Sequence, residues 1–271
     1  MIARWLLPFL VGCAPADAGS LAVIGAGGGG GGGAATPSNL WSGRTDRALG
    51  ADDDFFEDSD ASGYFDYDVD SQMALSEGAN GLELTVSAGG GVLIMGASKP
   101  ITAAASSYTV TTHVTWGGST WEANNAGPFL CVSEDVSAAP TTASHSCMGY
   151  QNSIPGAKYI QQSWTDYNSS GATQDVATYF GDVTGWWLRL CVLNGSTDTI
   201  RGLASSNGQT WSTGGTASVT FASAGVNPPV DVTLAAFTNN VAGVFRYDAL
   251  VIKTITETPG DCYHSTGGYD D

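Results

Sequence analysis

The stretch that decides the fold runs from residue 185 to residue 211 and reads GWWLRLCVLNGSTDTIRGLASSNGQTW. Its first part alternates between two sets of side chains. One set is Trp186, Leu188, Leu190 and Val192, and the other is Trp187, Arg189 and Cys191. A period of two residues predicts a β-strand, because successive side chains of a strand point to opposite faces. Asn194-Gly195 follows, and this dipeptide is the strongest short-range signal for a hairpin turn. The stretch therefore predicts a strand, a tight turn and a return strand.

Outward from this stretch, the same alternation recurs along the chain. It is seen in residues 82–86, 108–116, 186–192, 230–234 and 245–255. Glycine, asparagine and proline pairs separate these segments, and no segment shows a helical period. Glu and Lys are scarce while Val, Thr, Tyr and Trp are frequent, which favours strands over helices. The sequence predicts an all-β protein, an antiparallel β-sandwich.

The segment from Gly185 to Gly195, with the return strand and the Ser206–Trp211 turn, resembles a known hairpin. It is similar to the hairpin of concanavalin A-like lectin/glucanase jelly rolls, including laminin-G-like domains. That hairpin begins with a Trp-Leu-Arg pattern, here Trp187-Leu188-Arg189. The resemblance implies that the tryptophan of this pattern packs into the sandwich and that the second one, Trp211, closes over the edge. The resemblance also implies that Val244–Ile252 is the closing strand. It is clear over residues 180–255. This is a likeness of fold, and a fold does not by itself define a function.

The chain of 271 residues carries a net charge of −17. Such an acidic surface repels phosphate backbones, so nucleic acid is excluded as a partner. Composition divides the chain into three parts. These are an apolar leader or anchor arm with a Gly-rich linker (1–39), a jelly-roll sandwich (40–258) and a C-terminal tail (259–271).

The N-terminal part permits two interpretations. Arg4 precedes a short apolar run, and Leu10-Val11-Gly12-Cys13 resembles a lipobox, in which Cys13 would be lipidated after export. Alternatively the arm is retained, and residues 1–35 pack against neighbouring subunits of an assembly, with the glycines of residues 27–33 as a tether. The first interpretation predicts a secreted or membrane-tethered protein, and the second predicts an oligomeric particle.

Five cysteines are present, and none forms a metal-binding pair in the sequence. Cys131 and Cys147 each lie in a strand-like segment. If the two strands pair, a disulfide between these cysteines stabilises the fold by about 3 kcal/mol. The alternative is two reduced, buried thiols. Cys262 has no obvious partner in the sequence.

Acidic side chains at every second position suggest a cation site. Asp66, Asp68 and Asp70 place three carboxylates on one face of a strand, and carboxylate oxygens are ligands for calcium. No EF-hand spacing accompanies them, so a solvated acidic surface is the alternative. We expect no cofactor other than this possible calcium.

Aromatic and polar residues in loop-like contexts are candidates for sugar binding. Aromatic rings stack on sugar rings, and Asn or Asp side chains bind hydroxyls. The candidates are Trp121, Asn124, Trp164, Asp166, Tyr167 and Asn168. The alternative is that these tryptophans cap the core, as large aromatic residues commonly do.

Glycoside hydrolases of this fold carry a Glu-x-Asp-x-x-Glu pattern on one strand. No such pattern of paired carboxylates occurs here, nor does a Gly-x-Ser-x-Gly elbow. The sequence therefore predicts a protein that is not an enzyme.

The favoured function is a structural and binding module of a bacteriophage virion. It would be a tail-fibre, tail-tip or capsid-surface subunit that displays a lectin-like sandwich and contacts host glycans. The alternative is a secreted or lipid-anchored bacterial carbohydrate-binding protein with Cys13 as its lipidated residue.

Overall fold

A computed structural model describes most of the chain from residue 65 onward. The described residues are 65–67, 73–78, 81–87, 92–100, 107–117, 127–133, 145–154, 157–165, 172–178, 185–193, 198–213, 217–219, 231–239, 242–255 and 259–263. The leader, the glycine run and the acidic segment before Phe65 lie outside these residues. The structure is an antiparallel β-sandwich of the concanavalin A-like jelly-roll type, which confirms the predicted fold class.

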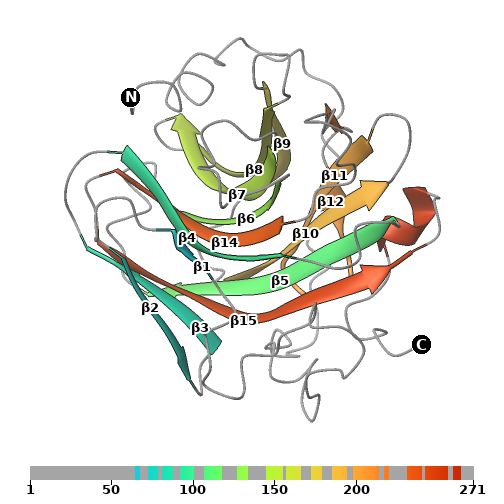
Figure 1. The fold of residues 1–271 in the computed structure, drawn as a ribbon. Helices are drawn as coiled ribbons and strands as arrows, with labels where there is room; N and C mark the ends of the chain where they lie inside the picture. Colours follow the sequence, from blue (N-terminus) through green and yellow to red (C-terminus); the bar gives the residue numbers. More distant parts are fainter. Residues whose placement is uncertain are drawn as a thin grey trace, which may run out of the picture.

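Two sheets form the sandwich (Figure 1). The front sheet contains, in spatial order, β1 (Phe65–Tyr67), β4 (Val92–Pro100), β14 (Asp231–Asn239), β6 (Gly127–Ser133), β7 (His145–Ile154), β8 (Ala157–Thr165) and β9 (Ala172–Thr178). The back sheet contains β12 (Ser212–Thr213), β11 (Asp198–Ser205), β10 (Gly185–Leu193), β5 (Tyr108–Gly117), β15 (Gly243–Thr254), β3 (Gly81–Val86) and β2 (Met73–Gly78). A short strand, β13 (Ala217–Val219), also pairs with β11.

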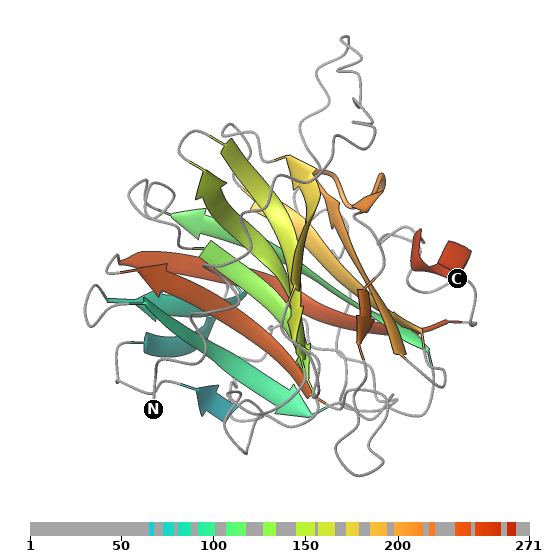
Figure 2. The same cartoon turned by 90° about the horizontal axis from the view of Figure 1, so that it is seen from above.

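The chain crosses between the sheets many times, so neighbours in space are distant in sequence. The closing strand β15 lies between β5 and β3, as the resemblance implied for this segment. A 3-10 helix, η5 (Pro259–Tyr263), follows β15 and lies at one end of the sandwich (Figures 1 and 2). The predicted hairpin of residues 185–205 is confirmed, because β10 and β11 pair from Trp187↔Ser205 to Leu193↔Thr199.

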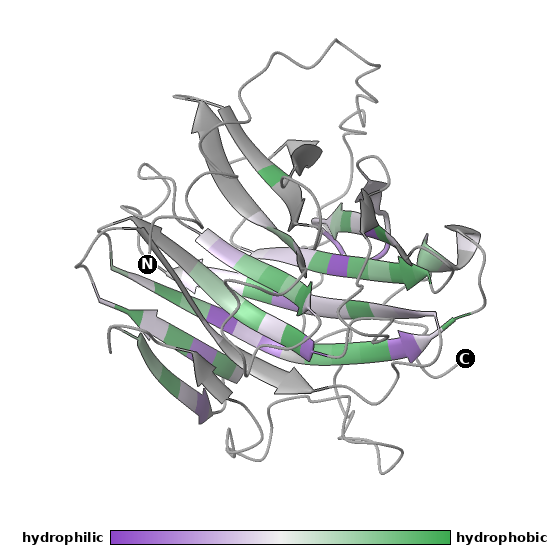
Figure 3. Ribbon diagram, turned by 45° about the horizontal axis from the view of Figure 1, so that its top comes forward, coloured by the Kyte–Doolittle hydropathy of each residue, from purple (hydrophilic) through white to green (hydrophobic). Residues whose placement is uncertain are grey.

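The main core lies between the two sheets. It is formed by side chains at alternate strand positions, an alternation that is visible when the ribbon is coloured by hydropathy (Figure 3). The first predicted set of the deciding stretch, Trp186, Leu188, Leu190 and Val192, belongs to this core. Burying such side chains contributes about 1.5–3 kcal/mol each, and this is the main driving force for joining the sheets.

Tyr247 connects the two sheets through the core. It belongs to β15, is fully buried, and places its hydroxyl 2.6 Å from the carbonyl oxygen of Ala235 and 3.0 Å from that of Phe129. The same hydroxyl accepts a hydrogen bond from the backbone N–H of Phe129. Burial raises the pKa of Tyr247 well above its usual range, with hydrogen bonds to Phe129 and Ala235 opposing the shift. Tyr247 of the back sheet is therefore hydrogen-bonded to two strands of the front sheet, β6 and β14.

Each sheet also buries part of its outward face. On the back sheet the second set of the deciding stretch, including Trp187 and Cys191, packs with Leu203, Trp211 and Cys262. Trp187 is the tryptophan of the Trp-Leu-Arg pattern, and the expectation that it packs into the sandwich is wrong. It is fully buried, but on the outward face, while its neighbour Trp186 enters the main core.

Candidate functional site

The outward face of the front sheet is the candidate ligand-binding face. Strands β6 to β9 curve so that this face is concave (Figure 1). Phe129, Cys131, Cys147 and Ala235 form a small apolar cluster on it, separate from the main core. They alternate along β6, β7 and β14 with residues that point into the sandwich. We call this cluster the front floor.

A disulfide joins two strands of the front floor. Cys131 and Cys147 face each other in the β6–β7 register, and their sulfurs are bonded, the pairing that the sequence suggested. Gly149 lies in the same strand as Cys147. A Cβ atom at Gly149 would lie 2.7 Å from the Cγ of Phe129, so a glycine allows the phenyl ring to lie on β7.

Polar side chains adjoin the front floor where β6 pairs with β14. Thr233 lies opposite Cys131, and Asp231 lies opposite Ser133. All three polar residues are buried, and Ser133 is 3% exposed. The hydroxyl of Ser133 has no hydrogen-bond partner within the described part of the chain. An apolar floor beside hydroxyl and carboxyl groups suits a sugar, which presents both C–H surfaces and hydroxyl groups.

The residues predicted for sugar binding lie mostly outside this description. Trp121, Asn124, Asp166, Tyr167 and Asn168 fall outside the described residues. Trp164 is in strand β8, opposite Ser146 of β7. The loop-like context expected for Trp164 is therefore wrong, because its segment extends a regular strand pair. Their roles in binding remain predictions.

Of the three residues predicted to bind calcium, the structure describes one. Asp66 lies in β1, opposite Ala97 of β4, whereas Asp68 and Asp70 fall outside the described residues. Within the described ranges, no group of three His, Cys, Asp or Glu side chains is arranged to hold a metal ion. Cys13, the lipidation candidate, also falls outside the described residues.

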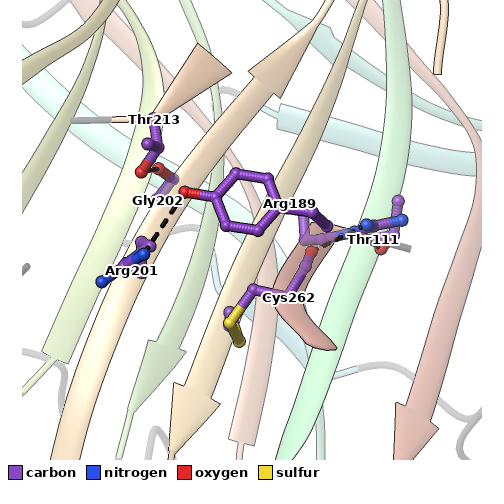
Figure 4. The surroundings of a disulfide bond; sticks show 8 residues. Thr111, Arg189, Arg201, Gly202, Thr213 and Cys262 are labelled. Atoms are coloured by element: carbon purple, nitrogen blue, oxygen red, sulfur yellow. Dashed lines mark hydrogen bonds between the residues drawn. A yellow bond between two sulfur atoms is a disulfide. The ribbon is translucent and has the colours of Figure 1, made fainter. Parts of the chain in front are cut away.

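The outward face of the back sheet carries a buried arginine. Arg189 of β10 donates from Nε to Thr111 Oγ1 at 2.8 Å and from a terminal nitrogen to the carbonyl oxygen of Cys262 at 3.0 Å (Figure 4). The ring of Trp211 covers the guanidinium at 3.9 Å. Burial lowers the pKa of Arg189 to about 9, because desolvation disfavours the charged form.

The turn before Trp211 explains how that ring reaches the arginine. Gly208 adopts a positive φ of 70°, which glycine tolerates without strain. The side-chain oxygen of Asn207 accepts hydrogen bonds from the backbone of Gln209 and Thr210, and Ser205 donates to the same oxygen. These local bonds reverse the chain after β11 and return Trp211 to the face of the sheet.

A histidine and an aspartate extend this polar face. His113 Nδ1 of β5 lies 2.6 Å from Asp248 Oδ2 of β15, and the His113 ring lies 4.8 Å from the ring of Trp187. Gly185 lies beside the same imidazole, since a Cβ there would be 2.9 Å from its Nε2. His113 is 6% exposed, so its imidazole is largely shielded from solvent on this face.

Sequence reasoning missed the covalent partner of Cys262. The structure joins Cys262 to Cys191 of β10, so the expectation that Cys262 lacks a partner is wrong. A separation of 71 residues hid the pair. The available signal was the position of Cys191 on the strand face opposite the core set.

Comparison with known proteins identifies the fold but no sequence family. No family model and no curated protein matches the chain. Lectin I from Ulex europaeus, solved with a methyl glycoside of α-L-fucose, is 13% identical with a TM-score of 0.50. The match covers 74% of this chain and 98% of the lectin.

Two glycan-degrading enzymes are also similar in structure. An engineered GH43 glycoside hydrolase with endo-xylanase and exo-arabinofuranosidase activity is 11% identical with a TM-score of 0.56, over 78% of this chain. A xylan β-1,4-xylosidase from Bacillus halodurans C-125 is 12% identical with a TM-score of 0.50, also over 78%. The chain spans only 42% of the first enzyme and 40% of the second.

These similarities establish a lectin-like sandwich, a fold found in proteins that bind or process carbohydrates. They also correct the prediction that the chain is not an enzyme, because part of each of two glycan-degrading enzymes shares its fold. At 11–13% identity they assign no activity. Among the described residues, no helix has the length and apolar character needed to cross a membrane.

Proposed function

We propose that this chain is a glycan-binding module of a bacteriophage particle, displayed as a tail-fibre, tail-tip or capsid-surface subunit. In this proposal the concave face of the front sheet binds a glycan of the host surface. Residues 1–35 attach the module to neighbouring subunits, and the glycine run acts as a tether between them. Any calcium would be held by Asp66, Asp68 and Asp70.

The observation that carries the binding proposal is the make-up of the front floor. An aromatic ring and a disulfide lie beside three buried polar side chains, and the hydroxyl of Ser133 lacks a partner within the described chain. A buried hydroxyl without a hydrogen bond is costly, and Ser133 is 3% exposed, so a ligand hydroxyl that displaces the cover over Ser133 and pairs with it would gain affinity. Asp231 and Thr233 extend the polar part of the same face.

A second candidate is favoured by the two disulfides. Disulfides form and persist mainly in oxidising compartments, and are rare in proteins that fold in the cytosol. The chain has two, Cys131–Cys147 and Cys191–Cys262. This observation favours a secreted or lipid-anchored bacterial carbohydrate-binding protein, with Cys13 lipidated. The intact mass of the native protein separates the two candidates, because lipidation removes the preceding residues and adds acyl chains.

Glycan binding is tested first on an array of bacterial and plant glycans, then by calorimetry with the best ligand. We expect Asp231→Asn and Ser133→Ala each to weaken binding by about tenfold, as the loss of a buried hydrogen bond predicts. Thr85→Val is the matched control, because Thr85 is exposed on the outward face of the back sheet. The proposal is wrong if no glycan binds, or if both variants bind as tightly as the control.

A further inference from the structure

The short helix η5 is held against the outward face of the back sheet at three points. Cys262 is bonded to Cys191, and its carbonyl oxygen accepts the hydrogen bond from Arg189. Tyr263 lies with its hydroxyl 3.3 Å from a terminal nitrogen of Arg201, which donates to it. The segment is thus connected to β10 and β11 by one disulfide and two hydrogen bonds, in the surroundings that Figure 4 shows.

Beneath η5 lies a surface that combines charge and aromatic area. Arg189 and Trp187 have no exposed surface, and Trp211 is 9% exposed. We call Arg189 together with Trp211 the covered surface. Both sulfur-bearing residues of the bond, Cys191 and Cys262, are also fully buried. Cys262 of η5 and the ring of Trp211 both lie against the guanidinium, so movement of η5 removes one of the groups that shield it from solvent.

The free energy of closing η5 over the sheet contains favourable and unfavourable contributions. Taking a guanidinium out of water is costly, and the lowered pKa of Arg189 reflects this cost. A 3-10 helix of five residues has poor hydrogen-bond geometry and little stability of its own. The disulfide closes a loop of 71 residues and so removes much of the entropy that would favour an open segment. The covalent bond is thus the main contribution that keeps the arginine covered.

We propose that η5 is a disulfide-locked strap: a dithiol that reaches the buried Cys191–Cys262 bond during local opening reduces it, and the freed strap then leaves the covered surface exposed. The dithiol attacks one sulfur as a thiolate, and the bond between the two cysteine sulfurs breaks. This attack forms a mixed disulfide between the dithiol and one cysteine. The second thiol of the dithiol then attacks the mixed disulfide and displaces that cysteine. The protein gains two electrons and two protons as two thiols, and the dithiol becomes an intramolecular disulfide.

The test follows the reaction of individual arginines with phenylglyoxal, read by peptide mass spectrometry. In the oxidised full-length protein we expect Arg246 to react and Arg189 to remain unmodified, since the side chain of Arg246 is 35% exposed. After treatment with dithiothreitol, Arg189 reacts at least ten times faster, while the rate at Arg246 is unchanged. Alkylation of the released thiols confirms reduction.

Matched variants assign the effect to one of the two disulfides. Cys191→Ala/Cys262→Ala exposes Arg189 without reductant. Cys131→Ala/Cys147→Ala leaves Arg189 protected until dithiothreitol is added. Hydrogen exchange of the β5 and β10 amides is measured in parallel and stays slow in every open state, because the strap lies outside the sheet.

Three results would overturn the proposal. Arg189 could react in the oxidised protein, which would show that η5 does not cover it. It could stay protected after complete reduction, which would show that closure does not depend on the bond. Finally, β5 and β10 could lose their exchange protection together with the exposure of Arg189, which would make the bond a support of the whole sheet.

Discussion

The outward faces of the two sheets each carry a disulfide, but the two bonds do different work. Cys131–Cys147 joins neighbouring strands whose backbones already pair. Cys191–Cys262 joins a strand to a helix 71 residues later. Backbone pairing therefore joins the strands of the front floor independently of their disulfide, whereas η5 is connected to β10 by a bond between residues far apart in the chain. One disulfide thus adds to an existing strand pair, and the other holds a segment that no strand pairing connects to the sheet.

The two faces also differ in what they bury. The front floor is apolar and has small polar groups at one end, including a Ser133 hydroxyl with no partner in the described chain. The back face buries a guanidinium whose hydrogen bonds to Thr111 and Cys262 lie within the protein. The first face therefore holds a buried hydroxyl without a partner among the described residues, whereas on the second face Thr111 and Cys262 bind the guanidinium.

Removal of a disulfide is expected to change the free energy of unfolding more than any other substitution proposed below. Cys191→Ala/Cys262→Ala should lower the free energy of unfolding by about 4 kcal/mol, and Cys131→Ala/Cys147→Ala by about 3 kcal/mol, because the first bond closes the longer loop. Denaturation in guanidinium chloride measures both values. The reverse order would show that the strand-to-strand bond is the stronger constraint.

A smaller loss of unfolding free energy is expected when the Tyr247 hydroxyl, which connects the two sheets, is removed. Tyr247→Phe removes the hydroxyl that binds Ala235 and Phe129, and should cost about 1–3 kcal/mol of unfolding free energy. The variant also leaves three buried backbone groups with one partner fewer: the N–H and the carbonyl of Phe129 and the carbonyl of Ala235. Tyr263→Phe is the control, because its hydroxyl lies at an exposed position.

The same tyrosine gives a pH dependence with a defined sign. The pKa of Tyr247 is raised in the folded state, so its contribution is fully present below the unfolded pKa of about 10. It is lost as the pH rises above that value. The stability of the wild-type protein should therefore fall more steeply above pH 10 than that of Tyr247→Phe. Equal slopes in urea titrations at pH 9 to 11 would contradict this assignment.

The smallest loss of stability is expected in the turn that returns Trp211 to Arg189. Asn207→Ala removes the acceptor for the N–H groups of Gln209 and Thr210, and should cost about 1 kcal/mol. Gln209→Ala is the control, since Gln209 is exposed and contributes its backbone to the turn. Thermal unfolding measures both variants, and equal melting temperatures would show that Gly208 alone sets the turn.

Particular residues show how far the candidate site was predictable. The strand positions of Cys131 and Cys147 suggested their pairing, because both segments alternate as strands do. Ser133, Asp231 and Thr233 were not candidates. They come together only because β14 pairs with β6 across about a hundred residues of chain. Trp164 was misassigned to a loop, since polar neighbours obscured the strand in which it lies.

The all-β class, the β10–β11 hairpin and the inward-facing set of β10 (Trp186, Leu188, Leu190 and Val192) could be predicted from the sequence. These follow from a two-residue period and from turn dipeptides, which act between neighbours in the chain. Tertiary structure alone decided that Trp187 and Arg189 are buried on the outward face, and that Cys262 bonds to Cys191. The physical reason is that an alternating strand defines two faces, whereas what covers each face depends on segments brought there by the topology.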